Sequence, residues 1–119
     1  MLFRSSNSCF FHSGATEGLN SLVLGILLKS NVNNKSFTFY YSKTDHSCIV
    51  NGIPLLIELG AKCVDLPISD DGHLDIKKTI NLIKSDEADT KVCAFTWVNN
   101  ETGLVQSLED ANEIKTQTN

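Results

Sequence analysis

The sequence predicts an α/β fold with three layers, α/β/α, in which helices cover both faces of a mainly parallel sheet. Short apolar runs rich in β-branched and aromatic residues alternate with longer runs that have helical apolar periodicity. The resulting order is βαβαβαβα, and strands joined through helices in this way lie parallel, with right-handed crossovers. Because no internal repeat, linker or low-complexity segment divides the chain, residues 1–119 are expected to form one unit.

The first strand–helix unit is expected to consist of a strand at residues 9–11 and a helix over residues 16–29. The strand is the apolar run Cys-Phe-Phe, and a Ser-Gly break separates it from the helix. Within the helix, apolar residues three and four positions apart share one face. These residues are Leu19, Leu22, Val23, Ile26 and Leu27.

The second unit begins with an aromatic and β-branched run, which predicts a strand at residues 36–41. Asp45 is the expected N-cap of the next helix, and Gly60 is its expected end. Pro54 lies inside this helical pattern and predicts a kink or a late start of the regular helix.

The last two units follow the same pattern. Residues 61–68 predict a short strand, after which Asp75 is expected to cap a third helix. Residues 91–98 predict another strand, followed by the polar loop 99–103. Residues 107–110, Ser-Leu-Glu-Asp, match a capping box in front of the final helix.

Composition excludes several classes of protein. The 10 Lys and Arg against 14 Asp and Glu give a net charge of -4 without a basic stripe, so nucleic acid is not an expected partner. The longest apolar run, residues 22–28, is far shorter than the roughly 20 residues of a membrane span. The first seven residues resemble no secretion signal, so a cytoplasmic location is expected. The four cysteines contain no C-x-x-C pair, so no metal site is expected, and buried free thiols are.

The junction at residues 13–17 has the chemistry of an anion-binding turn. The backbone amides at the start of a helix lack partners within the helix, and the helix dipole adds partial positive charge there. Gly14 lets the backbone approach an anion closely, Ala15 leaves room, and the Thr16 hydroxyl adds a hydrogen-bond donor. The alternative interpretation is a plain helix cap.

Three polar loops are expected to border one cleft. In parallel α/β sheets, ligands bind beyond the carboxyl ends of the strands. Residues 13–17, 44–47 and 99–103 all fall at such ends.

Four motifs together resemble, in order and spacing, the NifS-like cysteine desulfurases. These enzymes belong to the class V aminotransferase group of pyridoxal-phosphate proteins, which have the fold type I large domain. The resemblance covers residues 9–115 and the first half of that large domain. Its motifs are Ser-Gly-Ala-Thr-Glu at 13–17, Thr-Asp-His-Ser at 44–47, Asp-Gly-His-Leu-Asp at 71–75, and Val-Asn-Asn-Glu-Thr-Gly at 98–103.

The resemblance implies a binding site for pyridoxal 5'-phosphate. Ala15 and Thr16 correspond to residues that hold the cofactor phosphate, in agreement with the helix-terminus argument. His46 corresponds to the catalytic histidine that stacks on the pyridine ring and shuttles protons. Asn100 corresponds to the asparagine that binds the ring hydroxyl. The plainer alternatives are a helix-start histidine with a local hydrogen bond and an ordinary turn residue.

The implied reaction converts a small amino acid, L-cysteine, into L-alanine and protein-bound sulfur for iron–sulfur cluster or thio-cofactor synthesis. The Schiff-base lysine, the aspartate that pairs with the pyridine nitrogen and the sulfur-accepting cysteine of the family are not identified in this sequence. The chain is therefore expected to be a partial large domain, truncated at both ends and without the small domain, that is inactive alone. A homo-oligomer or a complementary chain is the expected partner. A selenocysteine lyase, another class V relative and a noncatalytic interaction remnant remain open alternatives.

Overall fold

The centre of the fold is strand β1, Phe37–Tyr41, whose aromatic and β-branched residues suit burial on both faces of a sheet. The computed structural model describes residues 10–118. Strand β1 pairs in parallel with β2, Lys62–Asp65, on one side and with β3, Thr90–Cys93, on the other. Phe39 is opposite Cys63 in one pair and Val92 in the other. The sheet order is β2-β1-β3, which confirms the predicted parallel sheet.

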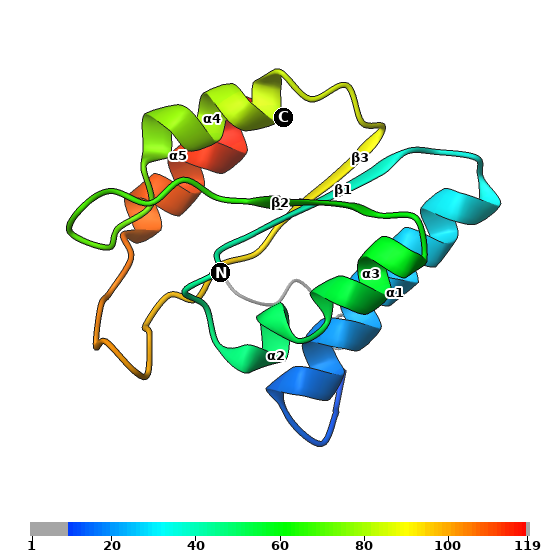
Figure 1. Ribbon diagram of the computed structural model, residues 1–119, viewed down its shortest axis with the longest axis horizontal. Helices are drawn as coiled ribbons and strands as arrows, with labels where there is room; N and C mark the ends of the chain where they lie inside the picture. The colour runs from blue at the N-terminus through cyan, green and yellow to red at the C-terminus, as the bar shows by residue number, and fades with distance from the viewer. Residues whose placement is uncertain (1–9, 119) are drawn as a thin grey trace.

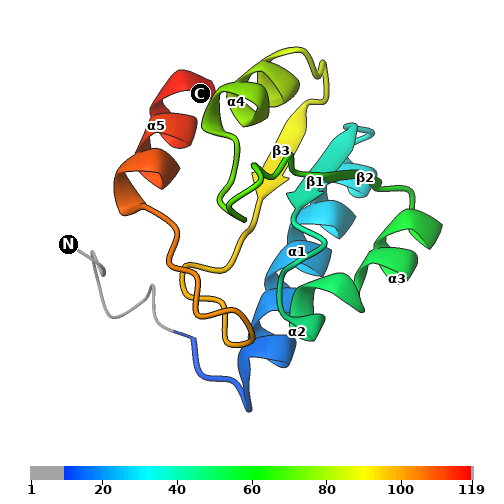
Figure 2. The same ribbon diagram turned by 60° about the vertical axis from the view of Figure 1, so that its left-hand side comes forward.

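Helices cover both faces of this sheet, as Figure 1 shows. The helices are α1 (Ala15–Val32), α2 (Ser47–Val50), α3 (Ile53–Glu58), α4 (Ile76–Lys84) and α5 (Leu108–Thr118). In Figure 2, α1, α2 and α3 lie on one side of the strands, and α4 and α5 lie on the other. The predicted three-layer α/β/α architecture is therefore correct.

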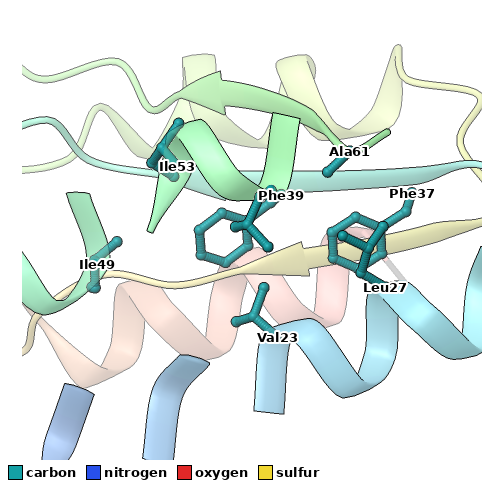
Figure 3. Close-up of a cluster of buried hydrophobic side chains, with 8 residues drawn as sticks. Val23, Leu27, Phe37, Phe39, Ile49, Ile53 and Ala61 are labelled. Carbon is teal, nitrogen blue, oxygen red and sulfur yellow. The ribbon is translucent and has the colours of Figure 1, made fainter. Parts of the chain in front are cut away.

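Two hydrophobic clusters hold the layers together, one on each face of β1. On the first face, Phe37 and Phe39 point toward Val23 and Leu27 of α1 (Figure 3). This cluster also contains Ile49, Ile53, Leu56 and Ala61. On the second face, Tyr40 lies with buried residues of α4 and α5. The alternation of Phe39 and Tyr40 between the two clusters follows from the two-residue period of a strand.

The predicted first strand is wrong for its described residues. Phe10 and Phe11 belong to no strand and are 83% and 97% exposed. Cys9, the other residue of that prediction, lies outside the described residues. Apolar composition alone indicates burial, but a strand also requires a neighbouring edge for its backbone hydrogen bonds. Here the adjoining Ser13 instead bonds to the first turn of α1.

Several predicted boundaries also change. The helix predicted after residue 45 is two short helices that meet at Asn51 and Gly52. Pro54 lies in the first turn of α3, which confirms the late start of the regular helix. Strand β3 ends at Cys93, and the chain continues as a loop although residues 94–98 are largely apolar.

Two burial predictions are wrong. Leu22 is 60% exposed, because Val23 and Leu27 make up the buried side of α1 instead. Cys93, at the end of an edge strand, is exposed, and Cys48 and Cys63 are partly buried. In residues 10–118, no helix has both the length and the apolar character that crossing a membrane requires.

Candidate functional site

The carboxyl ends of the three parallel strands meet at one edge of the sheet. Helix α1 runs antiparallel to β1, so its first turn lies at that same edge. Figure 2 shows the start of α1, helix α2 and the long loop after β3 together along the lower edge of the molecule. The loops with the predicted site residues therefore lie at one edge of the sheet. The expected single cleft is divided, because one cavity is lined by residues of the first and second loops and another by residues of the second and third.

The first turn of α1 presents free backbone donors. The Gly18 amide donates to the Gly14 carbonyl over 3.0 Å, the first hydrogen bond of this helix. The amides of Ala15, Thr16 and Glu17 precede that bond and so have no acceptor within the helix. Gly14 is extended, with φ and ψ both 174°. Apart from Gly14 and its two neighbours in the chain, no atom of the described residues comes within 4 Å of the place where a Cβ on Gly14 would lie. The turn is thus open to a ligand.

The start of α1 already attracts one negative charge. The Glu17 carboxylate accepts hydrogen bonds from the Ser13 hydroxyl over 2.5 Å and from the Ser13 amide over 2.7 Å. The hydroxyl bond, followed by the amide bond, lowers the pKa of Glu17 below its usual range. The carboxylate lies in the first turn, where the helix dipole favours negative charge.

His12 lies beside this turn without entering the helix. Its imidazole covers Gly18 so closely that a Cβ added to Gly18 would come within 2.6 Å of Nε2. Gly18 therefore provides the space that the ring occupies.

A cavity of about 260 Å³ joins α1 to α2. Thr16 and Asn20 line it from α1, and Ser47 and Cys48 line it from α2. Ala15 and Thr16 are both exposed. This cavity places the hydroxyl-bearing residue of the predicted phosphate turn next to the helix that follows His46.

His46 is the N-cap of α2, a role that the sequence assigns to Asp45. The backbone of His46 is extended (φ -56°, ψ 147°), and its Nδ1 accepts a hydrogen bond from the Cys48 amide over 3.1 Å. The prediction for Asp45 is wrong because its Oδ1 accepts instead from the Thr96 amide over 2.9 Å. Since Nδ1 is an acceptor, the neutral His46 ring has its proton on Nε2.

Asn100 lies in a turn that the preceding residue, Asn99, organises. The Asn99 Oδ1 accepts from the amides of Glu101 and Thr102 over 2.9 and 3.0 Å, which makes a tight turn around Asn100. Gly103 completes the turn with a φ of 73°, a conformation that favours glycine. The exposed Asn100 is therefore presented to solvent at this edge of the sheet.

The remaining motif borders the same loops. Asp71 and Gly72 line a second cavity, of about 140 Å³, together with Thr44 and Asn99. His73 pairs with Asp71 over 3.2 Å between Nδ1 and Oδ2, and both side chains are well exposed. In residues 10–118, no three His, Cys, Asp or Glu side chains gather into a metal-binding group.

Comparison with known proteins gives a consistent result. Residues 3–119 match the family model for aminotransferase class-V. The chain is 30% identical over 104 residues to the mitosomal cysteine desulfurase of Trachipleistophora hominis, and this alignment covers 87% of this chain and 23% of that protein. It is 32% identical over 109 residues to cysteine desulfurase IscS of Rickettsia prowazekii (strain Madrid E), and this alignment covers 92% of this chain and 25% of that protein.

A solved structure of a NifS-like protein has the same fold over 92% of this chain and 29% of its own length. The TM-score is 0.80 and the sequence identity is 25%. The chain spans about a quarter of the length of the curated relatives it matches.

Proposed function

The chain belongs to the class V aminotransferase family, and from that membership we propose that it forms the phosphate-binding and ring-facing part of a pyridoxal-phosphate site in a cysteine desulfurase. One observation carries the proposal. The first turn of α1, the His46 loop and the Asn100 loop lie at one edge of the sheet, and the two loops are hydrogen-bonded to each other.

The residues at the start of α1 fit a phosphate group. Three consecutive amides, those of Ala15, Thr16 and Glu17, have no acceptor within the helix, and Gly14 leaves open space beside them. The Thr16 hydroxyl adds a further donor at the mouth of the cavity between α1 and α2. These neutral donors and the positive end of the helix dipole suit a phosphate dianion.

His46 and Asn100 supply the groups for an aromatic ring with polar substituents. The imidazole is exposed, and the Cys48 amide fixes its neutral tautomer with the proton on Nε2. A histidine held in this way presents an aromatic face for stacking and a proton that it can give or take. The Asn100 carboxamide can accept and donate hydrogen bonds and therefore suits a ring hydroxyl.

When bound, pyridoxal 5'-phosphate supplies an electron sink for the carbon–hydrogen and carbon–sulfur chemistry of an amino acid. The reaction proposed for the whole protein converts L-cysteine to L-alanine with transfer of sulfur to a protein thiol. In this chain, the α1 turn anchors the phosphate and His46 holds a proton at Nε2 on the ring side of the site.

We propose that this chain alone binds the cofactor without turning over L-cysteine. Lys43 lies two residues after the end of β1 and directly precedes the His46 loop in the sequence. It pairs with Asp65 over 3.1 Å, and that hydrogen bond raises the pKa of Lys43. The pairing with Asp65 favours the ammonium form, which has no free electron pair, and so disfavours Lys43 as the lysine that condenses with the cofactor aldehyde.

Calorimetric titration with pyridoxine 5'-phosphate tests the proposal. This probe has the ring and phosphate of the cofactor but no aldehyde, so it cannot attach to surface lysines. We expect it to bind more tightly than inorganic phosphate or unphosphorylated pyridoxine, and inorganic phosphate should displace it. Equal binding of pyridoxine 5'-phosphate and inorganic phosphate would contradict the ring-facing part of the site, and binding of neither would leave the α1 turn as a helix cap only. Alanine production from L-cysteine with added pyridoxal 5'-phosphate would contradict the absence of turnover.

A further inference from the structure

Two hydrogen bonds join the loop before α2 to the loop after β3. The Asn99 Nδ2 donates to the Thr44 carbonyl over 2.8 Å. The Thr96 amide donates to Asp45 Oδ1 over 2.9 Å. Each bond connects residues more than 50 positions apart in the chain, 55 and 51 respectively. In each bond a side chain of one loop contacts the backbone of the other, and each loop supplies one of the two side chains.

Asn99 uses its whole side chain for this arrangement. Its Oδ1 accepts from the Glu101 and Thr102 amides and so shapes the turn that presents Asn100. Its Nδ2 is the group that reaches across to Thr44, two residues before His46. One side chain thus sets the conformation of the Asn100 turn and its position relative to the His46 loop.

Asp45 directly precedes His46 and makes the second cross-connection. Its Oδ1 is bound by Thr96, whereas its Oδ2 is buried without a hydrogen-bond partner among the described residues. A buried carboxylate oxygen without a partner costs stability. The cost is consistent with a residue whose role is to place its neighbour.

We propose that Asn99 and Asp45 are positioning residues, which lock the His46 loop to the Asn100 loop so that both side chains face one planar ligand. This inference rests on the proposed function and deepens it. Neither residue needs to touch the ligand. The phosphate turn at the start of α1 contributes no residue to either cross-connection, so the two residues act on the ring side of the site.

A second asparagine makes the same kind of side-chain-to-carbonyl bond far from the proposed site. The Asn31 Nδ2 donates to the Leu59 carbonyl over 3.0 Å and joins the end of α1 to the end of α3. Asn31 lies at the opposite edge of the sheet from His46 and Asn100, because α1 runs antiparallel to the strands. Asn31→Ser is therefore the control for Asn99→Ser. Serine at 99 keeps a short acceptor for the turn but cannot reach Thr44.

Calorimetric titration of both variants with pyridoxine 5'-phosphate and with inorganic phosphate is the first test. Asn99→Ser is expected to weaken binding of pyridoxine 5'-phosphate about fivefold, the equivalent of one net hydrogen bond. Its affinity for inorganic phosphate, and both affinities of Asn31→Ser, should stay at wild-type values. Unchanged binding of pyridoxine 5'-phosphate by Asn99→Ser, or equal losses for both probes, would overturn the proposal.

Hydrogen exchange in the ligand-free protein is the second test, and it does not depend on cofactor binding. If the two connections act together, exchange of the Thr96 amide accelerates in Asn99→Ser and not in Asn31→Ser. Asp45→Ala should accelerate exchange at Glu101 and Thr102, and Asp45→Asn, which keeps an acceptor oxygen, should restore protection. Unchanged exchange at Thr96 in Asn99→Ser refutes the locking of the loops. A wild-type protein without preference for pyridoxine 5'-phosphate refutes the proposed function instead, and exchange still decides whether the loops are locked.

Discussion

Replacement of Thr16 by alanine should selectively weaken phosphate binding. The substitution removes one hydroxyl beside the first-turn amides of α1, and those backbone donors remain. A hydrogen bond to a charged phosphate is worth roughly 1.5–3 kcal/mol, so we expect affinity to fall about 10- to 150-fold without being abolished. Alanine favours helix more than threonine does, and Thr16 is exposed, so the variant should remain folded.

The assay for this prediction is calorimetric titration with pyridoxine 5'-phosphate, checked by the thermal unfolding midpoint of each variant. Thr116→Ala is the matched control, because Thr116 is an exposed helical threonine in α5 whose hydroxyl bonds to the Glu113 carbonyl. The control should bind as the wild type does. Equal affinities of Thr16→Ala and Thr116→Ala would refute the assignment of Thr16 to the phosphate.

Three further predictions concern the pH dependence, the core and the ring side of the site. Burial raises the pKa of Asp86, but the hydrogen bond from Tyr40 and its other partners bring it to about 2. Because this folded-state pKa is depressed, about 2 kcal/mol of stability is present above roughly pH 4 and is lost as the pH falls toward 2. Tyr40→Phe should reduce this loss when the free energy of unfolding is measured in urea at each pH. The same loss of stability in acid for the variant and the wild type would contradict this prediction. Leu27 is fully buried, so Leu27→Ala should cost about 2–5 kcal/mol by the same assay, against less than about 1 kcal/mol for the half-exposed Leu28→Ala; similar losses would refute the packing described for α1. His46→Ala should weaken pyridoxine 5'-phosphate and leave inorganic phosphate unchanged in calorimetry, and loss of both would place the histidine at the phosphate instead.

Regular elements with a strong periodic pattern were predictable from the sequence. Strand β1 consists entirely of aromatic and β-branched residues, and the structure buries it on both faces. Helix α4 begins after Asp75, as predicted, and the Asp75 side chain accepts from the Lys78 amide. In both cases the deciding interactions are local or follow from burial alone.

Elements that depend on a neighbour were not predictable in the same way. Phe10 and Phe11 have the composition of a strand, yet no strand forms at these residues. Residues 94–98 look like a continued β3, but Trp97 and Val98 are exposed and the chain bends into the Asn99 turn. An apolar run indicates a preference for burial, and backbone pairing decides whether a strand forms.

The candidate site residues show the same contrast between local signals and contacts that are distant in the sequence. Thr16 was predicted to lie at a helix start because a glycine turn before a helix is a local signal, and the structure places it in the first turn of α1. The N-cap was misassigned to Asp45 because aspartate is the commoner capping residue, and the Thr96 amide that binds it is 51 positions away. Asn99 was missed as an organiser of the site for the same reason, although an Asn-Asn pair in a polar loop is a sign of side-chain turn formation.

The most direct test of the whole account is an amide NMR titration of the isotope-labelled chain with pyridoxine 5'-phosphate. The account predicts the largest shifts at the Ala15, Thr16 and Glu17 amides, with a second group of shifts at His46 and Asn100. Inorganic phosphate should reproduce only the first group. Shifts that are scattered over the surface, or that leave the first turn of α1 unaffected at saturation, would contradict the proposed cofactor site.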